Sequence, residues 1–204
     1  MELPATTKDI TVDLLNEVLH ENGFLGNSDI VSLKHEQIGV GEGFMSDIAR
    51  LSIKYDSEGN NLPTSIVVKL PTSFPPARKA GMESGAYERE TRFYTEVASK
   101  SPLRTPETIY TYLNQDEQQY ILIMKDYSHC KKIDISEGAD EELAKTIIIK
   151  MADFHTRWWD AKNLHSFPWI PRMDNSYKAF VMKQYQSVIH ECLNLEGFER
   201  IVPP

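Results

Sequence analysis

A glycine-rich turn, a lysine and a glutamate follow one another between Ile38 and Glu90 of this 204-residue chain. The turn is Gly39-Val40-Gly41-Glu42-Gly43-Phe44, and Lys69 stands in the apolar run that ends at Leu70. Glycines let the backbone come close to a ligand, because they have no side chain to obstruct it. A lysine can contact phosphate groups, and a carboxylate can hold that lysine in place. The order of these residues therefore indicates a binding site for the phosphates of a nucleotide.

The glycine turn has a simpler interpretation, since a tight hairpin turn favours the same residues. Its spacing is a weak signal when it stands alone. Lys69 strengthens the nucleotide interpretation, because it follows Ser65-Ile66-Val67-Val68 and is expected at the end of a buried strand. A buried ammonium is costly unless it is paired. The alternative is a lysine on an edge strand whose charged end reaches water.

Glu90 is the carboxylate expected to pair with Lys69. Residues 83–99 have a helical pattern, with apolar residues one turn before Glu90 and one and two turns after it. These residues are Ala86, Phe93, Tyr94 and Val97. This spacing places Glu90 on the apolar side of the helix. Glu88 shares its side with polar residues, so it is expected in solvent or in a surface ion pair.

The elements that must position these residues follow from apolar periodicity and turn signals. Strands are expected at 31–39, 44–55, 62–70, 108–113 and 119–124, and helices at 11–22, 83–99, 141–161 and 175–194. Residues 71–78, which contain three prolines, are expected to form a loop. The helix at 141–161 carries a broad apolar stripe and is expected to be largely buried. Because strands come first and helices later, the sequence predicts an α+β fold rather than alternating β and α units.

Composition excludes several classes of protein. The net charge is −8, from 22 basic and 30 acidic residues, which argues against a nucleic-acid-binding protein. Cys130 and Cys192 are far apart and in no metal-type spacing, so free thiols in a reducing cytosol are expected. The sequence has no secretory signal pattern and no apolar run long enough to cross a bilayer. A cytoplasmic protein without a membrane partner is therefore predicted.

Taken together, the segments resemble the aminoglycoside phosphotransferase and choline kinase-like superfamily, including its ecdysteroid-kinase-like branch. The resemblance covers most of residues 38–159. It rests on residues 39–46, Val67-Val68-Lys69, residues 89–94, residues 122–127 and residues 151–159. It implies a protein-kinase-like fold. Its N-terminal lobe would hold a five-stranded antiparallel sheet with one packed helix, followed by the first helices of an α-helical C-terminal lobe.

The resemblance also implies domains and a nucleotide site. Residues 1–124, with a helix at 9–22, would form the nucleotide-binding lobe, 125–139 the hinge and crossover, and 140–204 a partial helical lobe. The expected cofactors are ATP and Mg²⁺. Lys69 would contact the α- and β-phosphates and pair with Glu90. The residues expected to cover the phosphates are Gly39, Gly41, Gly43, Phe44 and Ser46.

The adenine base would lie at the hinge. The resemblance implies that the Lys125 carbonyl and the Tyr127 N–H bind adenine, and that Met124 lines the back of its slot. Simple packing of Met124 within its strand would give the same sequence pattern.

The sequence departs from the family pattern after the long helix. Family members carry an aspartate in a His-Gly-Asp context and a second aspartate for Mg²⁺, whereas none of the six histidines here precedes Gly-Asp. The chain is therefore expected to stop before the catalytic loop, with no catalytic or metal-binding residues of its own. Positioning and metal ions carry most phosphoryl-transfer catalysis, so these 204 residues alone are expected to be inactive.

Three interpretations of function remain open. The first is a fragment of an ATP-dependent kinase that phosphorylates a small-molecule hydroxyl. The second is a non-catalytic, pseudokinase-like module that binds nucleotide or acts as a scaffold. The third is an unrelated α+β domain in which the glycine turn is only a hairpin. Uncovered apolar helix faces in the partial C-terminal lobe could also lead to self-association.

Overall fold

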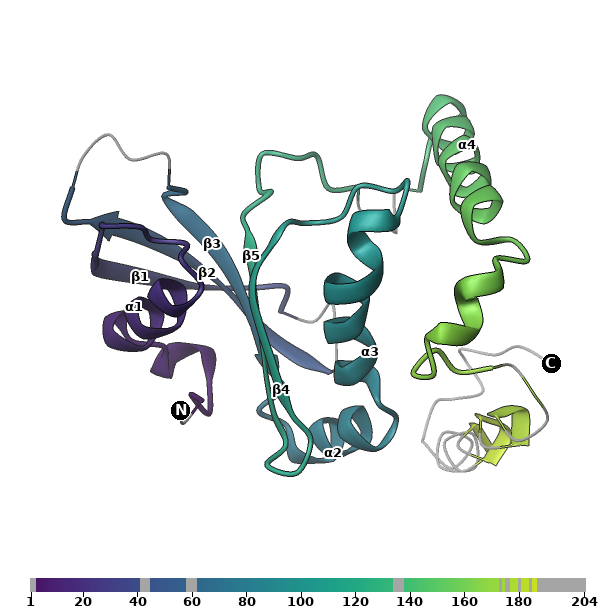
Figure 1. The fold of residues 1–204 in the computed structure, drawn as a ribbon, viewed down its shortest axis with the longest axis horizontal. Helices are drawn as coiled ribbons and strands as arrows, with labels where there is room; N and C mark the ends of the chain where they lie inside the picture. The colour runs from purple at the N-terminus through teal and green to yellow at the C-terminus, as the bar shows by residue number, and fades with distance from the viewer. Residues whose placement is uncertain are drawn as a thin grey trace, which may run out of the picture. The chain divides into compact units, whose positions relative to one another are not determined.

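The computed structural model describes residues 3–40, 45–57, 62–133 and 138–172, together with 174, 177–179, 181–183 and 185–186. Contacts divide the chain into two units, Met1–Ala161 and Lys162–Pro204. The first unit contains the sheet and its helices (Figure 1). The lobe boundaries expected at residues 124 and 140 stay a prediction.

Five antiparallel strands form one sheet among the described residues, in the order β1-β2-β3-β5-β4 (Figure 1). The strands are β1 (Ile30–Ile38), β2 (Ser46–Tyr55), β3 (Ser65–Pro71), β4 (Thr108–Asn114) and β5 (Gln119–Lys125). All five expected strands are confirmed, with ends shifted by a few residues. The α+β class with a five-stranded antiparallel sheet is therefore confirmed as well.

One face of the sheet is covered by α1 (Val12–Glu21). The helix begins after Thr11, whose side chain accepts a hydrogen bond from Leu14 N at 3.1 Å, as N-terminal capping residues do. Alternate residues of the central strands turn toward α1. The fully buried members of this core include Leu15, Val18, Leu19, Leu51, Ile66, Val68, Ile121 and Ile123. Because strand side chains alternate between faces, the residues between them face the other side.

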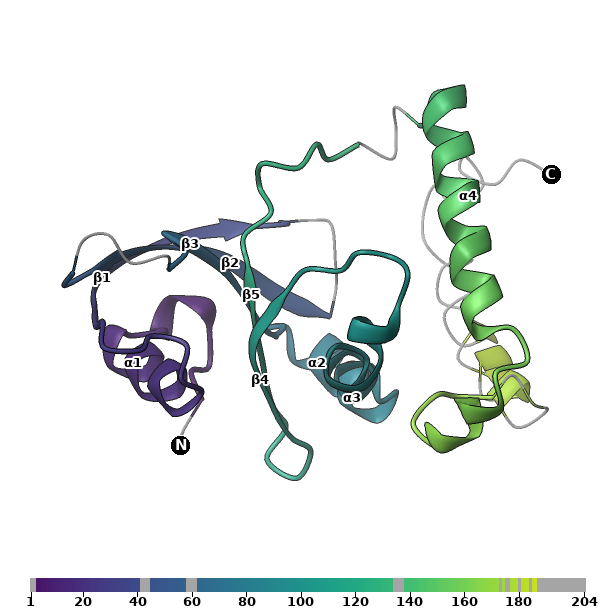
Figure 2. The same ribbon diagram turned by 45° about the horizontal axis from the view of Figure 1, so that its top comes forward.

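The opposite face is covered by the helices that follow β3. They are α2 (Pro75–Glu83), α3 (Ala86–Arg92), a π-helical turn η2 (Phe93–Val97) and a 3₁₀ turn η3 (Ala98–Lys100). Figures 1 and 2 show α1 and α3 on opposite sides of the central strands. A second apolar cluster forms here from Tyr87, Tyr120 and Leu122. This face is the one that carries Lys69.

The expected loop at 71–78 is wrong in its second half, because α2 begins at Pro75. Proline fits the first turn of a helix, where its missing N–H has no helical partner to lose. The single helix expected at 83–99 also begins later than expected. Gly85 has φ 69° and separates α2 from α3, a backbone conformation that glycine adopts without strain.

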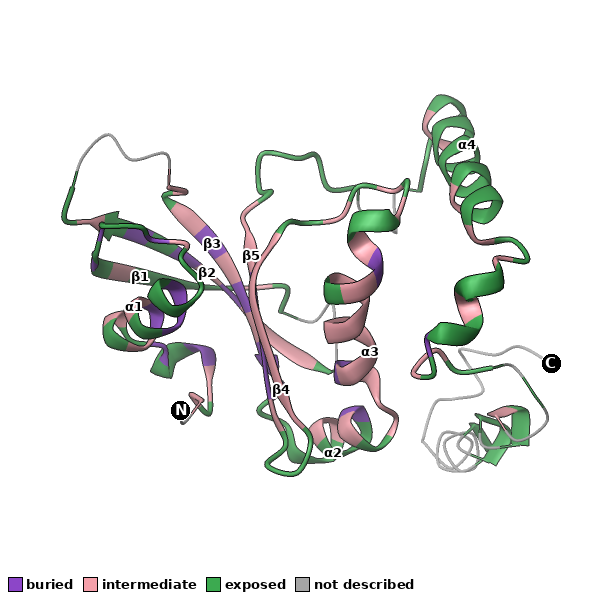
Figure 3. Ribbon diagram, in the orientation of Figure 1, coloured by how far each residue is buried: buried purple, intermediate pink, exposed green. Residues whose placement is uncertain are grey.

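The second long helix, α4 (Glu141–Trp158), is capped by Asp140, which accepts a hydrogen bond from Leu143 N at 2.8 Å. Its expected burial is wrong: no residue of α4 is buried, and Ile148 is 67% exposed (Figure 3). An apolar stripe shows that a face can be buried, but burial needs a second element to cover it. Within the first unit, no described element covers the stripe of α4.

The second unit contains the 3₁₀ helix η4 (Lys162–Ser166). Of the helix expected at 175–194, residues 177–179, 181–183 and 185–186 are helical, and the others lie outside the described residues. Within the described part of the chain, no helix is both long enough and apolar enough to cross a membrane.

Candidate functional site

Lys69 and Glu90 form an ion pair, as the sequence predicted. Lys69 Nζ lies 2.6 Å from Glu90 Oε1 and 2.7 Å from Oε2, so both carboxylate oxygens accept from the ammonium. The two side chains are 20% and 28% exposed. Partial shielding from water makes this attraction stronger than that of an exposed pair. Glu88 instead pairs with Arg92 Nε at 2.9 Å, but its side chain is 28% exposed, the same as that of Glu90, so the expected contrast in exposure between the two glutamates is not seen.

Tyr120 is a second hydrogen-bond donor to Glu90. Its hydroxyl donates to Glu90 Oε2 at 3.0 Å, and the residue is fully buried. Burial raises the pKa of the Tyr120 hydroxyl, and the nearby Glu90 charge raises it further, so the group stays a protonated donor. Tyr120 was not among the residues predicted from the sequence. The alternation of β5 could have placed it on the same sheet face as Leu122 and Met124.

Tyr120→Phe is expected to destabilise the protein by about 1.5–2 kcal/mol, because a hydrogen bond to a charged, half-buried carboxylate is lost without a change of shape. Urea denaturation measures this change in the free energy of unfolding. Tyr112→Phe is a matched control on β4, because the Tyr112 hydroxyl has no hydrogen-bond partner among the described residues. Equal effects of the two substitutions would show that the Tyr120–Glu90 bond contributes nothing.

Tyr87 on α3 ties the exit of the glycine turn to the helix that carries Glu90. Its hydroxyl donates to the Met45 carbonyl, which also accepts from Thr72 N at 3.1 Å. At the start of the turn, Gly39 has φ 67° and directly follows β1. Ser46, a predicted phosphate-covering residue, begins β2. The two hydrogen bonds to the Met45 carbonyl fix the exit of the turn.

Three predicted residues of the turn, Gly41, Gly43 and Phe44, lie outside the described residues. Their role in covering phosphates therefore stays a prediction, as does that of Gly39 and Ser46.

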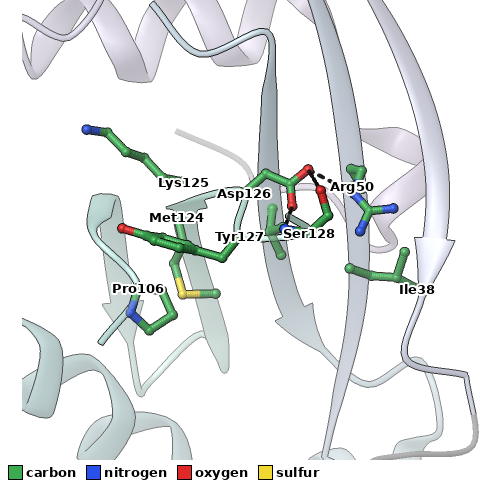
Figure 4. A pocket seen from close by; sticks show the side chains of 9 residues that line it. Ile38, Arg50, Pro106, Met124, Lys125, Asp126, Tyr127 and Ser128 are labelled. Carbon is green, nitrogen blue, oxygen red and sulfur yellow. Dashed lines mark hydrogen bonds and ion pairs between the residues drawn. The ribbon is translucent and has the colours of Figure 1, made fainter. Parts of the chain in front are cut away.

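An open pocket of about 230 Å³ lies at the end of β5 (Figure 4). Three predicted hinge residues, Met124, Lys125 and Tyr127, line it. The other lining residues are Ile38, Arg50, Val67, Pro106, Asp126 and Ser128. Figure 4 shows Pro106, Met124 and Tyr127 on one side, with Ile38 and Arg50 on the other. The pocket walls thus come from β1, β2, β3, β5, the segment before β4 and the segment after β5.

Strand register places this pocket beside the ion pair. Val67 on β3 is opposite Met124 on β5, and Lys69 is opposite Leu122. Since residues two apart on a strand share a face, Val67 and Lys69 face the same side of the sheet. The predicted base-binding residues and the predicted phosphate-binding lysine are therefore neighbours on one surface.

Asp126, inside the predicted hinge, is a lining residue that the sequence analysis did not single out. Its side chain is 10% exposed and accepts hydrogen bonds from Arg50, Ser65 and Ser128. Burial alone would raise its pKa, but the hydrogen bonds from Ser65 and Ser128 and the charge of Arg50 outweigh burial and lower it. The sequence gives no signal for the Arg50 contact, because the two residues are 76 positions apart.

The described residues contain no group of three or more His, Cys, Asp or Glu side chains that could hold a metal ion. No residue is therefore assigned to Mg²⁺ in this part of the chain.

A five-stranded antiparallel sheet with a lysine on β3, a glutamate on α3 and a pocket at the end of β5 is the arrangement of a kinase-like N-terminal lobe. Comparison with protein families agrees with this class. The model of the ecdysteroid kinase-like family matches residues 40–194, and the chain belongs to that family. No curated protein matches the chain. Family membership implies kinase-like phosphotransferase chemistry.

Proposed function

We propose that this chain binds ATP in the pocket beside the Lys69–Glu90 pair, as the nucleotide-binding part of a small-molecule kinase. The single observation that carries the proposal is the bidentate contact of Lys69 with Glu90 at 2.6 and 2.7 Å. It lies on the sheet face that also lines the pocket at Val67 and Met124. Such a pair holds a lysine where it can contact phosphates instead of leaving it free in solvent.

Each predicted site residue has a proposed role. Ile38 and Val67 supply apolar walls for a flat base, Met124 lines the back of the slot, and the Lys125 carbonyl and Tyr127 N–H hydrogen-bond the base. Gly39, Gly41, Gly43, Phe44 and Ser46 cover the phosphates. Mg²⁺ bound to the phosphates would neutralise charge that develops during transfer.

The acceptor is proposed to be a hydroxyl of a small molecule, in keeping with the kinase-like family. No histidine in the 204 residues precedes Gly-Asp, so this sequence lacks the motif that would orient such a hydroxyl. We therefore expect residues 1–204 by themselves to bind nucleotide without transferring phosphate. We further propose residues 1–124 as the nucleotide-binding lobe, 125–139 as the hinge and crossover, and 140–204 as part of a helical lobe, in a cytoplasmic protein.

A non-catalytic nucleotide-binding or scaffolding module is the second candidate. It is supported by the exposed apolar side chains of α4, among them Ile147, Ile148 and Ile149 at 48%, 67% and 61% exposure. Large exposed apolar patches often mark contact surfaces. This candidate also predicts nucleotide binding without turnover, or a stable complex with no nucleotide at all.

Isothermal titration calorimetry of the purified chain with ATP, adenosine and tripolyphosphate tests the proposal. We expect ATP to bind most tightly, because it alone reaches both the pocket and Lys69. Adenosine should bind weakly through the pocket, and tripolyphosphate weakly through Lys69. Absence of ATP binding by a chain that melts cooperatively would contradict the nucleotide site. The purified chain, freed of contaminating phosphatases, should not consume ATP when a mixture of alcohols is supplied as acceptors.

A further inference from the structure

Asp126 lines the pocket and lies at the centre of a hydrogen-bond network that includes two other lining residues, Arg50 and Ser128. Oδ2 accepts from Arg50 Nε at 2.9 Å, from Ser65 Oγ at 2.7 Å and from Ser128 Oγ at 3.2 Å, and Oδ1 accepts from Ser128 N at 2.9 Å. The donors come from β2, β3 and the segment after the hinge. Figure 4 shows the carboxylate between Arg50 and Ser128.

The network continues to the edge of the sheet. Arg50 Nη1 contacts Glu36 Oε2 on β1 at 2.9 Å, so a chain of charges runs from β1 through β2 to the hinge. The register explains this line, because Glu36 lies opposite Arg50, Arg50 opposite Val67, and Val67 opposite Met124. A nearly buried carboxylate with this many donors has little freedom to move.

Lys125, which precedes Asp126 in the hinge, is held by contacts with Glu107. Lys125 N donates to the Glu107 carbonyl at 2.9 Å, and Lys125 Nζ contacts the Glu107 carboxylate at 2.7 Å. Contacts from β2 and β3 hold the Asp126 side chain, and contacts from residue 107 hold the Lys125 N–H and ammonium, so the backbone torsions next to the two peptide groups that flank Asp126 are restrained. These peptide groups include the Lys125 carbonyl and the Tyr127 N–H, whose directions depend on the backbone torsions that these contacts restrain.

We propose that Asp126 is a positioning residue that makes the pocket selective for adenine over guanine, an inference that rests on the proposed nucleotide site. Adenine presents an amino donor at N6 and an acceptor at N1, whereas guanine presents a carbonyl acceptor at O6 and a donor at N1. A hinge with a fixed carbonyl and a fixed N–H pairs with the first pattern. With guanine, the hinge carbonyl would face the O6 acceptor and the hinge N–H would face the N1–H donor. Neither pair can form a hydrogen bond.

The physical reason for selectivity is the cost of unpaired polar groups. A site built to hydrogen-bond one pattern rejects a ligand that lacks it far more strongly than an apolar pocket can. This holds only while the backbone cannot turn to meet the other pattern. Asp126 supplies that restraint through its hydrogen bonds with Ser65 and Ser128. Loss of these hydrogen bonds should therefore lower the preference for adenine over guanine before it abolishes nucleotide binding.

The test is the ratio of the dissociation constants of GDP and ADP, measured by calorimetry at fixed Mg²⁺ and salt. Wild type is expected to prefer ADP by about 100-fold or more. Asp126→Asn should reduce this ratio by about tenfold, the value of one well-made hydrogen bond to a charged group, while ADP still binds. Ser65→Ala removes a donor to Asp126 without touching the pocket wall, and should reduce the ratio by about threefold. Ser65→Thr keeps the hydroxyl and should restore it.

The control is Lys69→Ala, which should weaken ADP and GDP equally and leave their ratio unchanged. An unchanged ratio in both Asp126→Asn and Ser65→Ala would overturn the positioning role. If Asp126→Asn does not fold, the Ser65→Ala and Ser65→Thr pair decides. Wild type that binds ADP and GDP equally would overturn this inference alone, whereas wild type that binds neither would also overturn the proposed function.

Discussion

Lys69→Ala is expected to lower the affinity for ATP by about 100-fold, equal to about 2.7 kcal/mol. The substitution removes the ammonium that would contact the phosphates and leaves Glu90 with Tyr120 as its remaining donor. Truncating one member of a shielded charge pair across a binding interface costs about 2–5 kcal/mol, and here that pair is the Lys69 ammonium with the proposed phosphate. Calorimetric titration with Mg²⁺-ATP measures the loss directly.

Lys79→Ala is the matched control for this prediction. Lys79 lies on α2, is 73% exposed and, among the described residues, has one weak ion-pair partner, Glu83 at 3.7 Å. It should leave ATP affinity unchanged. A thermal melt of each variant separates loss of binding from loss of folding. ATP affinity that is the same in Lys69→Ala as in wild type would remove Lys69 from the site, and with it the main support for the proposed function.

Gly81→Leu is expected to destabilise the protein by about 3 kcal/mol or more, because it overpacks a buried contact. A Cβ at Gly81 would lie 2.6 Å from Tyr87 Cε2, 2.8 Å from Cζ and 2.9 Å from the hydroxyl oxygen. Tyr87 has little room to move away. It is 2% exposed, its ring centroid lies 5.0 Å from that of Tyr120, and its hydroxyl donates to the Met45 carbonyl.

Helix propensity acts in the opposite direction at this position. Replacing glycine inside a helix with alanine normally stabilises the helix by about 1 kcal/mol. The sign of the measured change in unfolding free energy therefore shows whether helix propensity or the clash with Tyr87 is larger. Urea denaturation of Gly81→Ala and Gly81→Leu measures the balance, and Ala80→Gly on the exposed side of α2 reports propensity alone. The Gly81→Ala, Tyr87→Leu double variant should lose less stability than the two single losses combined, because the smaller side chain relieves the clash. Stabilisation by Gly81→Leu would contradict the close contact.

Local sequence determined most of the elements that hold the site. Short apolar runs bounded by turn residues marked the strands, and β3 and β5 are nearly continuous apolar runs, as is typical of strands with both faces covered. Thr11 and the apolar stripe of α1 marked the helix that covers the sheet face opposite to Lys69. The position of Glu90 relative to Ala86 and Phe93 identified the partner of Lys69, because helical spacing places those residues on one side. These signals are local, so a single sequence is enough to read them.

The contacts that join distant segments were decided only by the tertiary structure. Arg50 and Asp126, and Tyr120 and Glu90, are brought together by strand register and helix docking, which no short window of sequence specifies. The burial of α4 could not be read from its stripe for the same reason. An apolar face shows what a helix can bury, whereas only a second packed element determines whether it is buried.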